Sequence, residues 1–245
     1  MDVSPAADVP VRPASTVLAL RPASRGFEVL MVRRVRSAVF MGDARVFPGG
    51  ALEEADSSPL AARAVRWHGD PAELPWRAAG LRELAEEAGV LLTDPPGVAA
   101  AGKGAGLYEA LVAGGAVLDA DRLTYFSNWV TPRFRGAARR FDTRFYVAVV
   151  PPGTEAGADR AEVTEASWVT PAGALQRAAE GEWKVEFPTL CHLQVLAGCA
   201  AAEEVPALAP PPGEVVAVRP RVVLLGEEGF RILLPGDPGY EEALP

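Results

Sequence analysis

The stretch that decides the fold is Arg82-Glu83-Leu84-Ala85-Glu86-Glu87-Ala88-Gly89-Val90. At about 100° per residue, a helix places three carboxylates on one side and small or apolar residues on the other. The two sets are Glu83, Glu86 and Glu87 against Leu81, Leu84, Ala85 and Ala88. Pro75 suits the first turn of this helix and Gly89 suits its end. The pattern predicts an amphipathic helix over residues 75–88 with one apolar face and one acidic face.

The acidic face of this helix has two interpretations. Carboxylates at these spacings repel one another by roughly 0.2 to 0.5 kcal/mol per pair, which a solvated surface helix tolerates. A divalent cation would remove the repulsion, because hard cations such as Mg²⁺ prefer oxygen ligands and commonly act on phosphates. The helix by itself does not choose between a solvated face and a cation site.

The composition limits the class of protein. The 245 residues are 49% hydrophobic without a run of eighteen apolar residues, which predicts one globular domain with appendages and no membrane span. A net charge of -8 argues against binding to a nucleic-acid backbone. Residues 1–13 lack the pattern of a secretory signal, so we expect a cytoplasmic protein. Cys191 and Cys199, eight residues apart in a predicted helix, are not expected to form a disulfide.

Periodicity and turn residues predict the order of the elements along the chain. Strands are expected at 15–20, 27–33, 125–130, 144–150 and 162–169, helices at 59–67, 107–113, 171–180 and 188–202, and a terminal hairpin at 215–225 and 230–234. The predicted organisation is a flexible N-terminal arm (1–14), a main domain (15–204) with an insertion (51–75) and a candidate cap (91–120), and a Pro-rich connector with the hairpin (205–245). The hairpin could complete a sheet, cover the site or pair with a second subunit as a homodimer.

Basic residues gather at two places beside predicted strands. Arg33, Arg34, Arg36 and Arg45 precede Phe47-Pro48-Gly49-Gly50, and Arg133, Arg135, Arg139 and Arg140 are expected in a loop. Each group is either a set of solvated arginines or a site for substrate phosphate. Gly49 and Gly50 allow a tight turn that exposes backbone groups to a ligand or an ion.

Gly49-Gly50 combined with Arg82–Val90 resembles the Nudix box, whose pattern is G-x5-E-x7-R-E-U-x-E-E-x-G-U with U an aliphatic residue. The second half matches at every specified position. In the first half Asp56 stands where the pattern has Glu, and 25 residues instead of seven separate Asp56 from Arg82, an excess of 18. The resemblance implies an α/β/α sandwich around a mixed β-sheet. It leaves open whether Asp56 still approaches the helix.

The insertion and several short motifs resemble the Nudix subgroup that includes the peroxisomal coenzyme A diphosphatase. These motifs are Phe40-Met41-Gly42, Trp129-Val130-Thr131-Pro132, Arg140-Phe141-Asp142-Thr143 and Pro235-Gly236-Asp237. Ala38 stands where the subgroup's basic motif has Arg, and Gly42 is one residue out of its spacing. Coenzyme A or acyl-coenzyme A is therefore the first expected substrate, with ADP-ribose or another nucleotide sugar as the alternative. The terminal Ala243-Leu244-Pro245 is not a peroxisomal signal.

The resemblance also implies roles for individual residues. Mg²⁺ or Mn²⁺ would be held by Glu83, Glu86, Glu87 and the carbonyl of Gly49. Arg82 would orient a glutamate, and one of the box glutamates or Glu162 would accept the proton of the attacking water. Substrate-binding residues would be Arg33, Arg34, Arg45, Gly50, Arg140 and Arg144. Glu165 is expected to be structural.

Two alternatives of another class stay open at this point. One is a catalytically retired Nudix domain that binds a nucleotide, and the other is a protein-interaction scaffold that uses residues 205–245. The expected partner of the enzyme is a small nucleoside diphosphate derivative, with neither nucleic acid nor membrane.

Overall fold

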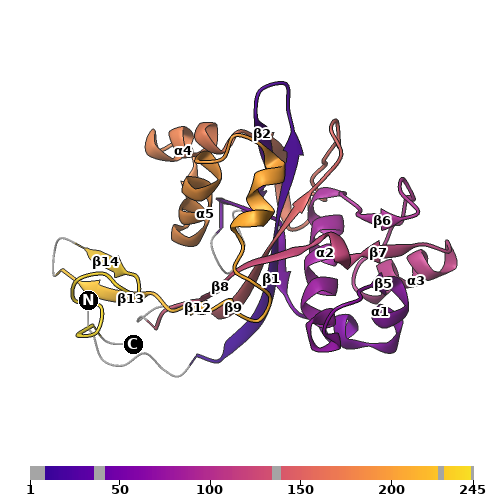
Figure 1. Ribbon diagram of the computed structural model, residues 1–245, viewed down its shortest axis with the longest axis horizontal. Coiled ribbons are helices and arrows are strands. Elements are labelled where there is room, and N and C mark those ends of the chain that lie inside the picture. The colour runs from indigo at the N-terminus through magenta and orange to yellow at the C-terminus, as the bar shows by residue number, and fades with distance from the viewer. Residues whose placement is uncertain (1–8, 36–41, 134–138, 226–228, 244–245) are drawn as a thin grey trace.

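The computed structural model describes residues 9–35, 42–133, 139–225 and 229–243. Arg36, Ala38, Phe40, Met41 and Arg135, which the sequence analysis singled out, lie outside these ranges. A mixed sheet forms the centre of the molecule (Figure 1), with the order β11-β3-β2-β1-β9-β8-β12, β10 beside β2 and β4 beside β1. Its strands are β1 (Val11–Pro22), β2 (Phe27–Arg34), β3 (Ala44–Val46), β4 (Gly49–Ala51), β8 (Thr124–Val130), β9 (Arg140–Val149), β10 (Val163–Val169), β11 (Lys184–Val185) and β12 (Ala217–Val218).

β1 is the strand around which the sheet is built. It pairs in parallel with β9 from Val11 to Leu20 and antiparallel with both β2 and β4. Successive side chains point to opposite faces, so Val17 belongs to one core and Leu18 to the other. β1 begins at Val11 instead of Ser15, within the predicted arm, because its first residues pair with the start of β9.

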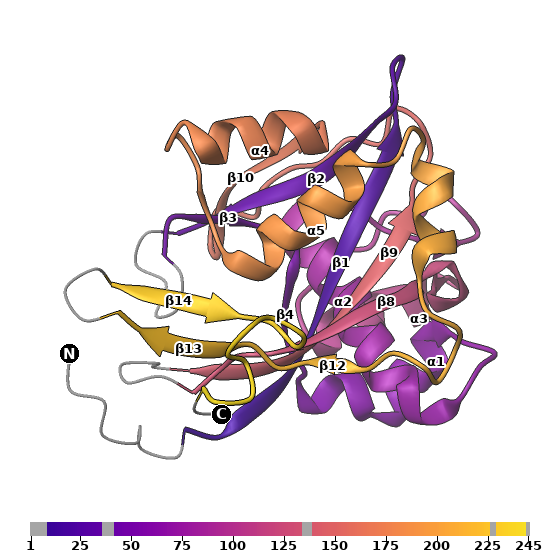
Figure 2. The same cartoon turned by 60° about the vertical axis from the view of Figure 1, so that its left-hand side comes forward.

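Helices cover both faces of this sheet, as Figures 1 and 2 show together. One face carries α2 (Leu74–Ala88) with α1 (Pro59–Ala64) and α3 (Ala105–Ala113), and the other carries α4 (Pro171–Ala179) and α5 (Phe187–Ala197). Each face has its own hydrophobic core, since apolar side chains alternate along both β1 and β9. The α/β/α sandwich around a mixed sheet that the sequence predicts is confirmed.

The insertion and the candidate cap come together beside α2. β5 (Val65–Arg66) from the first pairs in parallel with β7 (Val117–Asp119) from the second, and β6 (Thr93–Asp94) pairs with β7. Three 3₁₀ helices complete this unit: η1 (Glu54–Ser57), η2 (Pro71–Glu73) and η3 (Ala120–Arg122). Leu107, Tyr108 and Leu111 of α3 are fully buried in the same core as α2. The two segments, which α2 separates along the chain, thus pack together as one unit.

Several of the described segments differ from the elements that the sequence predicts, among them the helix expected at 59–67, which ends at Ala64 where β5 begins. α5 ends at Ala197 before Gly198, and a 3₁₀ helix, η4 (Ala202–Leu208), follows it. The first strand of the terminal hairpin is divided by Pro220, so β12 joins the main sheet and only β13 (Arg221–Leu224) pairs with β14 (Phe230–Leu233). Arg140 begins β9 instead of lying in a loop.

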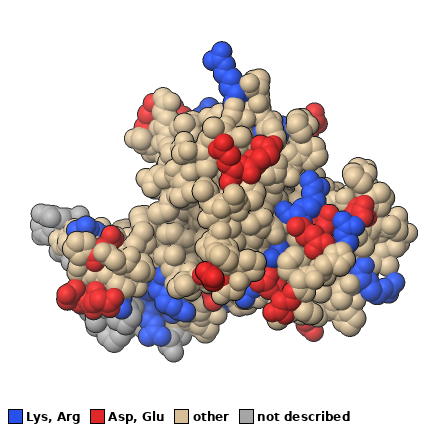
Figure 3. Space-filling view, viewed as in Figure 1, with Lys and Arg blue, Asp and Glu red and all other residues tan. Residues whose placement is uncertain are grey.

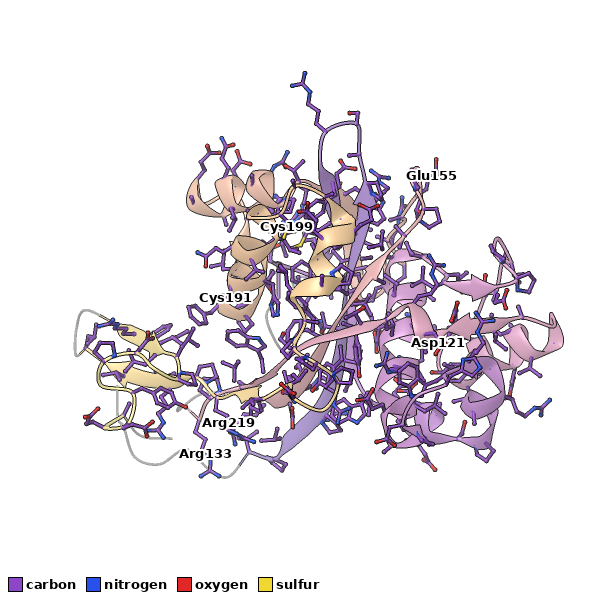
Figure 4. The ribbon with its side chains drawn as sticks, in the orientation of Figure 1. Asp121, Arg133, Glu155, Cys191, Cys199 and Arg219 are labelled. Carbon is purple, nitrogen blue, oxygen red and sulfur yellow. The ribbon has the colours of Figure 1, made fainter. Side chains whose placement is uncertain are left out.

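Cys191 on α5 and Cys199 beyond its end are both free thiols (Figure 4). Among the described residues, no helix combines the length and the apolar character needed to cross a bilayer.

Candidate active site

α2 presents its glutamates to the sheet instead of to water. Pro75 lies in the first turn, and Gly89, with φ of 66°, ends the helix in the left-handed region that favours glycine. Glu87 is 2% exposed and Glu83 is 8% exposed. A solvated acidic face would leave both side chains in water, so that interpretation is wrong.

The two glycines of β4 receive these glutamates. The backbone N–H of Gly49 donates to Glu87 Oε2 at 3.0 Å. A Cβ atom at Gly50 would overlap the carboxylate of Glu83, whose oxygen and carbon atoms lie directly against the Gly50 backbone. Only glycine at position 50 therefore leaves Glu83 in its observed place.

Arg82 is buried between Asp56 and Glu83 and binds both. Its side chain is 1% exposed, and it donates from Nη1 to Glu83 Oε1 at 2.7 Å. It also donates to Asp56 from Nε at 2.8 Å and from Nη2 at 3.0 Å. Burial alone would lower the pKa of the guanidinium, but the carboxylates of Asp56 and Glu83 outweigh burial and raise this pKa. Arg82 is therefore a permanent buried cation that fixes the orientation of Glu83.

Asp56 approaches the helix despite the insertion. Residues 57–73 leave the site through α1, β5 and η2 and return at the start of α2, so the excess length is taken up away from Asp56. The carboxylate is fully buried and accepts hydrogen bonds from Arg82 and from the hydroxyl of Tyr108. The question that the sequence left open is answered, because an aspartate with a long insertion after it still holds the arginine of the box.

Glu86 and Glu162 lie at the edge of this cluster. Glu86 accepts a hydrogen bond from the backbone N–H of Gly104 at 2.8 Å. Glu162 precedes β10, its side chain is 59% exposed, and its charge raises the pKa of both Glu83 and Glu87. Lys103 Nζ lies 3.6 Å from Glu162 Oε1 and 2.7 Å from Asp159 Oδ2. Residues of α2 and of the segments just before α3 and β10 therefore surround one acidic site.

Burial raises the pKa of the two innermost glutamates. Loss of solvent raises the pKa of Glu83 to about 7, although Arg82 acts in the opposite direction. Loss of solvent and the charge of Glu83 raise the pKa of Glu87 to about 8. The pKa values of both carboxylates stay raised although Arg82 lies beside Glu83 and Arg34 acts on Glu87, so the site lacks positive charge, which a divalent cation would supply.

The carboxylate oxygens have the chemistry of a hard-cation site, but they do not converge in a preformed one. Within the ranges that the structure describes, no three His, Cys, Asp or Glu side chains are grouped as metal ligands. Glu83 faces Arg82, Glu86 faces Gly104, and Glu87 faces Gly49. A cation would therefore compete with protein donors for these oxygens.

The predicted basic residues fall on different faces of the sheet. Arg34 lies on the α2 face, and its charge lowers the pKa of Glu87. Its neighbour Arg33 points to the other face and pairs with Asp43 at 2.6 Å. Arg45, also on that other face, pairs with Glu165 at 2.5 Å and lies over the ring of Trp183 at 4.5 Å. Of these three arginines, Arg34 is the one on the same face as the box glutamates.

The remaining two predicted arginines, Arg140 and Arg144, lie on β9. Arg140 is buried and donates to the carbonyl of Thr131 at 3.1 Å, next to the start of β1. Arg144 lies over the ring of Trp76, 4.1 Å from its centroid, at the first turn of α2. Trp76 and Glu87 are separated by about 16 Å along the helix axis. Arg144 is thus on the face of the site but at the opposite end of α2.

Sequence reasoning did not identify the contributions of α3. Tyr108 and Gly104 both contact the site directly, yet the segment Leu91–Ala120 has only Gly- and Ala-rich composition to mark it. Asp56 had a signal, because it occupies the position of the first acidic residue of the box. Tyr108 had none, since a single tyrosine in an apolar helix is most often a core residue.

Acidic and basic side chains lie close to one another around α3 and the β5-β7-β6 sheet. On the face shown in Figure 3, basic and acidic side chains are interspersed over the region of α3 and the β5-β7-β6 sheet. Arg66 there pairs with Asp94 and with Asp119. This face offers no continuous basic stripe of the kind that follows a nucleic-acid backbone.

Comparison with solved structures identifies a close overall likeness. The crystal structure of a Nudix hydrolase from Alicyclobacillus acidocaldarius matches with a TM-score of 0.71 and 30% sequence identity. The match covers 84% of this chain and 100% of that one. The likeness therefore extends over most of this chain and the whole of the other.

Curated proteins give a second set of similarities. The acyl-coenzyme A diphosphatase NUDT19 of Gallus gallus is 28% identical over 296 aligned positions, which span 88% of this chain and 73% of that protein. The protein of the same name from Homo sapiens is 28% identical over 283 positions, spanning 90% and 74%. No protein-family model matches the chain.

Proposed function

The chain belongs to the Nudix hydrolase family and is a Nudix-type diphosphate hydrolase, and from this premise we propose that it cleaves coenzyme A or acyl-coenzyme A with the help of a divalent cation. The observation that carries the substrate class is the similarity, along about nine tenths of the chain, to proteins named acyl-coenzyme A diphosphatase. The buried carboxylates of α2 support the reaction type. The retired nucleotide-binding domain and the interaction scaffold have no comparable support.

The cation would be held by Glu83, Glu86, Glu87 and the carbonyl of Gly49. Nudix hydrolases generally use divalent metal ions, and Mg²⁺ or Mn²⁺ suits a site made of oxygen atoms. The fit rests on the oxygen chemistry of these groups and on the burial of Glu83 and Glu87, which raises the pKa of both carboxylates and marks a site short of positive charge. A cation bound there would neutralise the diphosphate and make the attacking water more acidic.

The chain's own residues would position the reactants. Arg82 holds Glu83 in one orientation, so that its second oxygen is directed away from the arginine. Arg34 would bind a phosphate oxygen beside Glu87, and Arg144 would contact a more distant part of the substrate. Glu162 would accept the proton of the attacking water, because its exposed carboxylate lies within electrostatic reach of Glu83 and Glu87. The water oxygen forms a new bond to phosphorus while the bridging P–O bond breaks.

A hydrolysis screen tests the substrate. The purified protein is incubated with Mg²⁺ or Mn²⁺ and with coenzyme A, acyl-coenzyme A, ADP-ribose, NADH and dinucleoside polyphosphates, and the products are identified by mass. We expect 3′,5′-ADP and phosphopantetheine or its acyl derivative from the coenzyme A substrates, at a higher kcat/KM than for ADP-ribose. A higher kcat/KM for ADP-ribose would replace coenzyme A by the nucleotide-sugar alternative.

Two matched pairs of variants test the residues. Glu87→Gln should abolish turnover, whereas Glu109→Gln, an exposed glutamate on α3, should leave it unchanged. Arg34→Gln should raise KM for the diphosphate about tenfold, the effect of losing one hydrogen bond between charged groups. Arg33→Gln, one residue away but on the other face, should leave KM within twofold. Equal effects of the two arginine substitutions would refute the proposed role of Arg34.

A further inference from the structure

Asp56 accepts four hydrogen bonds from the residues around it. It is fully buried, and its two carboxylate oxygens accept from Arg82 Nε and Nη2, from the backbone N–H of Glu53 at 2.8 Å and from the hydroxyl of Tyr108 at 2.6 Å. The Tyr108 hydroxyl and Arg82 Nε share the same oxygen, Oδ1. The position of Arg82 is therefore set jointly by Asp56 and by whatever holds Asp56.

Tyr108 can act only as a donor in this arrangement. Burial and the neighbouring charge of Asp56 raise the pKa of the phenol, so the hydroxyl keeps its proton. Both oxygens of Asp56 already accept hydrogen bonds from Arg82, so the O–H bond of Tyr108 points at Oδ1. The ring is completely buried in the core that α3 shares with α2, which fixes the hydroxyl in place.

A second contact joins the same helix to the glutamates. Gly104, which immediately precedes α3, donates its backbone N–H to Glu86 at 2.8 Å. Its φ of 53° lies in the left-handed region, so another residue would be strained there. Gly104 and Tyr108 thus reach two different acidic groups of the site, Glu86 of α2 through a backbone N–H and Asp56 of η1 through a side chain.

We propose that Tyr108 is a positioning residue for the glutamates of α2, acting through Asp56 and Arg82, and that its hydroxyl occupies the space that a longer acid at position 56 would need. The side chain of Asp56 is one methylene shorter than the glutamate that the Nudix pattern has at this position. The Tyr108 hydroxyl fills the remaining space and holds the short carboxylate against Arg82. Arg82 in turn holds Glu83 at 2.7 Å. This inference rests on the proposed cation site.

The test compares four proteins: wild type, Tyr108→Phe, Asp56→Glu and the double variant. Tyr146→Phe is the matched control, because Tyr146 is equally buried but lies on β9 beside Tyr125. The first readout is Mn²⁺ binding in the absence of substrate, measured by electron paramagnetic resonance of the free ion. The second is kcat and KM for coenzyme A, and the third is the urea midpoint in EDTA, which reports folding.

We expect Tyr108→Phe to weaken Mn²⁺ binding on the order of tenfold and to lower kcat with little change in KM, because it removes one hydrogen bond to a charged group. Asp56→Glu should weaken Mn²⁺ binding at least as much, since the longer side chain at position 56 displaces the tyrosine. The double variant should recover Mn²⁺ affinity to within about threefold of wild type, because the space vacated by the hydroxyl admits the longer carboxylate.

Each other outcome overturns a defined part of the reasoning. Unchanged Mn²⁺ binding in Tyr108→Phe, or an equal loss in Tyr146→Phe, would overturn the positioning role while leaving the proposed function intact. A double variant that binds Mn²⁺ no better than the weaker single variant would overturn the inference that the Tyr108 hydroxyl occupies the space of a longer acid. Wild-type protein that binds no Mn²⁺ would overturn the cation site and the inference that rests on it.

Discussion

Asp56→Asn is the substitution that most directly measures the buried ion pair beneath the site. The change keeps the size of the side chain but removes its charge. Arg82 is 1% exposed and stays positively charged, because its pKa is raised. Its remaining acidic neighbours are Glu83 at 2.7 Å and, farther away, Glu86 at 3.7 Å and Glu53 at 3.9 Å. The variant therefore contains a buried guanidinium that has lost the carboxylate that held it at two nitrogen atoms.

The expected loss follows from the cost of a buried charge without its partner. Removing one member of a buried pair lowers the free energy of unfolding by roughly 3 to 5 kcal/mol. For a chain of this size, a change of 1 kcal/mol moves the melting temperature by about 2 to 4 °C. The variant should therefore melt about 6 to 20 °C below wild type.

The assay is thermal and urea unfolding, followed by circular dichroism in EDTA so that metal binding does not contribute. Glu241→Gln is the control, because its pair with Arg221 lies 3.7 Å apart with the glutamate 82% exposed. Such a surface pair contributes about 1 kcal/mol or less. A change below 1 kcal/mol in Asp56→Asn, equal to that of the control, would refute the view that Asp56 and Arg82 form a stabilising pair beneath the glutamates.

Three further predictions concern the glycine turn, the opposite face and the dependence on pH. Gly50→Ala should lower kcat at least about tenfold in steady-state assays, because its Cβ overlaps the carboxylate of Glu83; full activity would contradict this. Glu165→Gln should lower the free energy of unfolding by about 1 to 3 kcal/mol in urea, because it leaves the buried Arg45 without its partner, while KM stays at the wild-type value. In EDTA, the free energy of unfolding should fall by a few kcal/mol as the pH rises from about 4.5 to 8, because Glu83 and Glu87 bind protons in the native state that the unfolded chain has released. Mn²⁺ should reduce this fall, and stability that rises over the same interval would contradict the raised pKa values.

The spacing of residues was sufficient to predict the main elements of the fold. Alternation of apolar residues located β1 and β2, and the periodicity of Arg82–Val90 located α2 with Pro75 at its start and Gly89 at its end. These signals are local, because one face of a strand or helix must be apolar wherever it meets a core. The ends of elements were less predictable. Val11 joins β1 only because β9 lies beside it, and β9 comes more than a hundred residues later in the chain.

The sequence also identified the acidic residues of the candidate site, but it could not determine which neighbours act on them. Arg33 and Arg34 are adjacent in the chain, yet the alternation of β2 places them on opposite faces, and only the packing of α2 decides which face is the site. A hydrogen bond between Tyr108 and Asp56 joins residues 52 positions apart. Such a contact depends on how α3 packs in three dimensions, since a buried donor must lie within hydrogen-bonding distance of its acceptor.

Helix α2 therefore shows what the sequence and the tertiary structure each determine. By itself the sequence determined that three carboxylates share one side of α2, because that follows from helical geometry alone. Only the tertiary structure decided that Glu83 and Glu87 are buried, and that an aspartate followed by a long insertion still holds Arg82. The physical reason is that burial, and with it the raised pKa of each glutamate, depends on what the rest of the chain places against the helix.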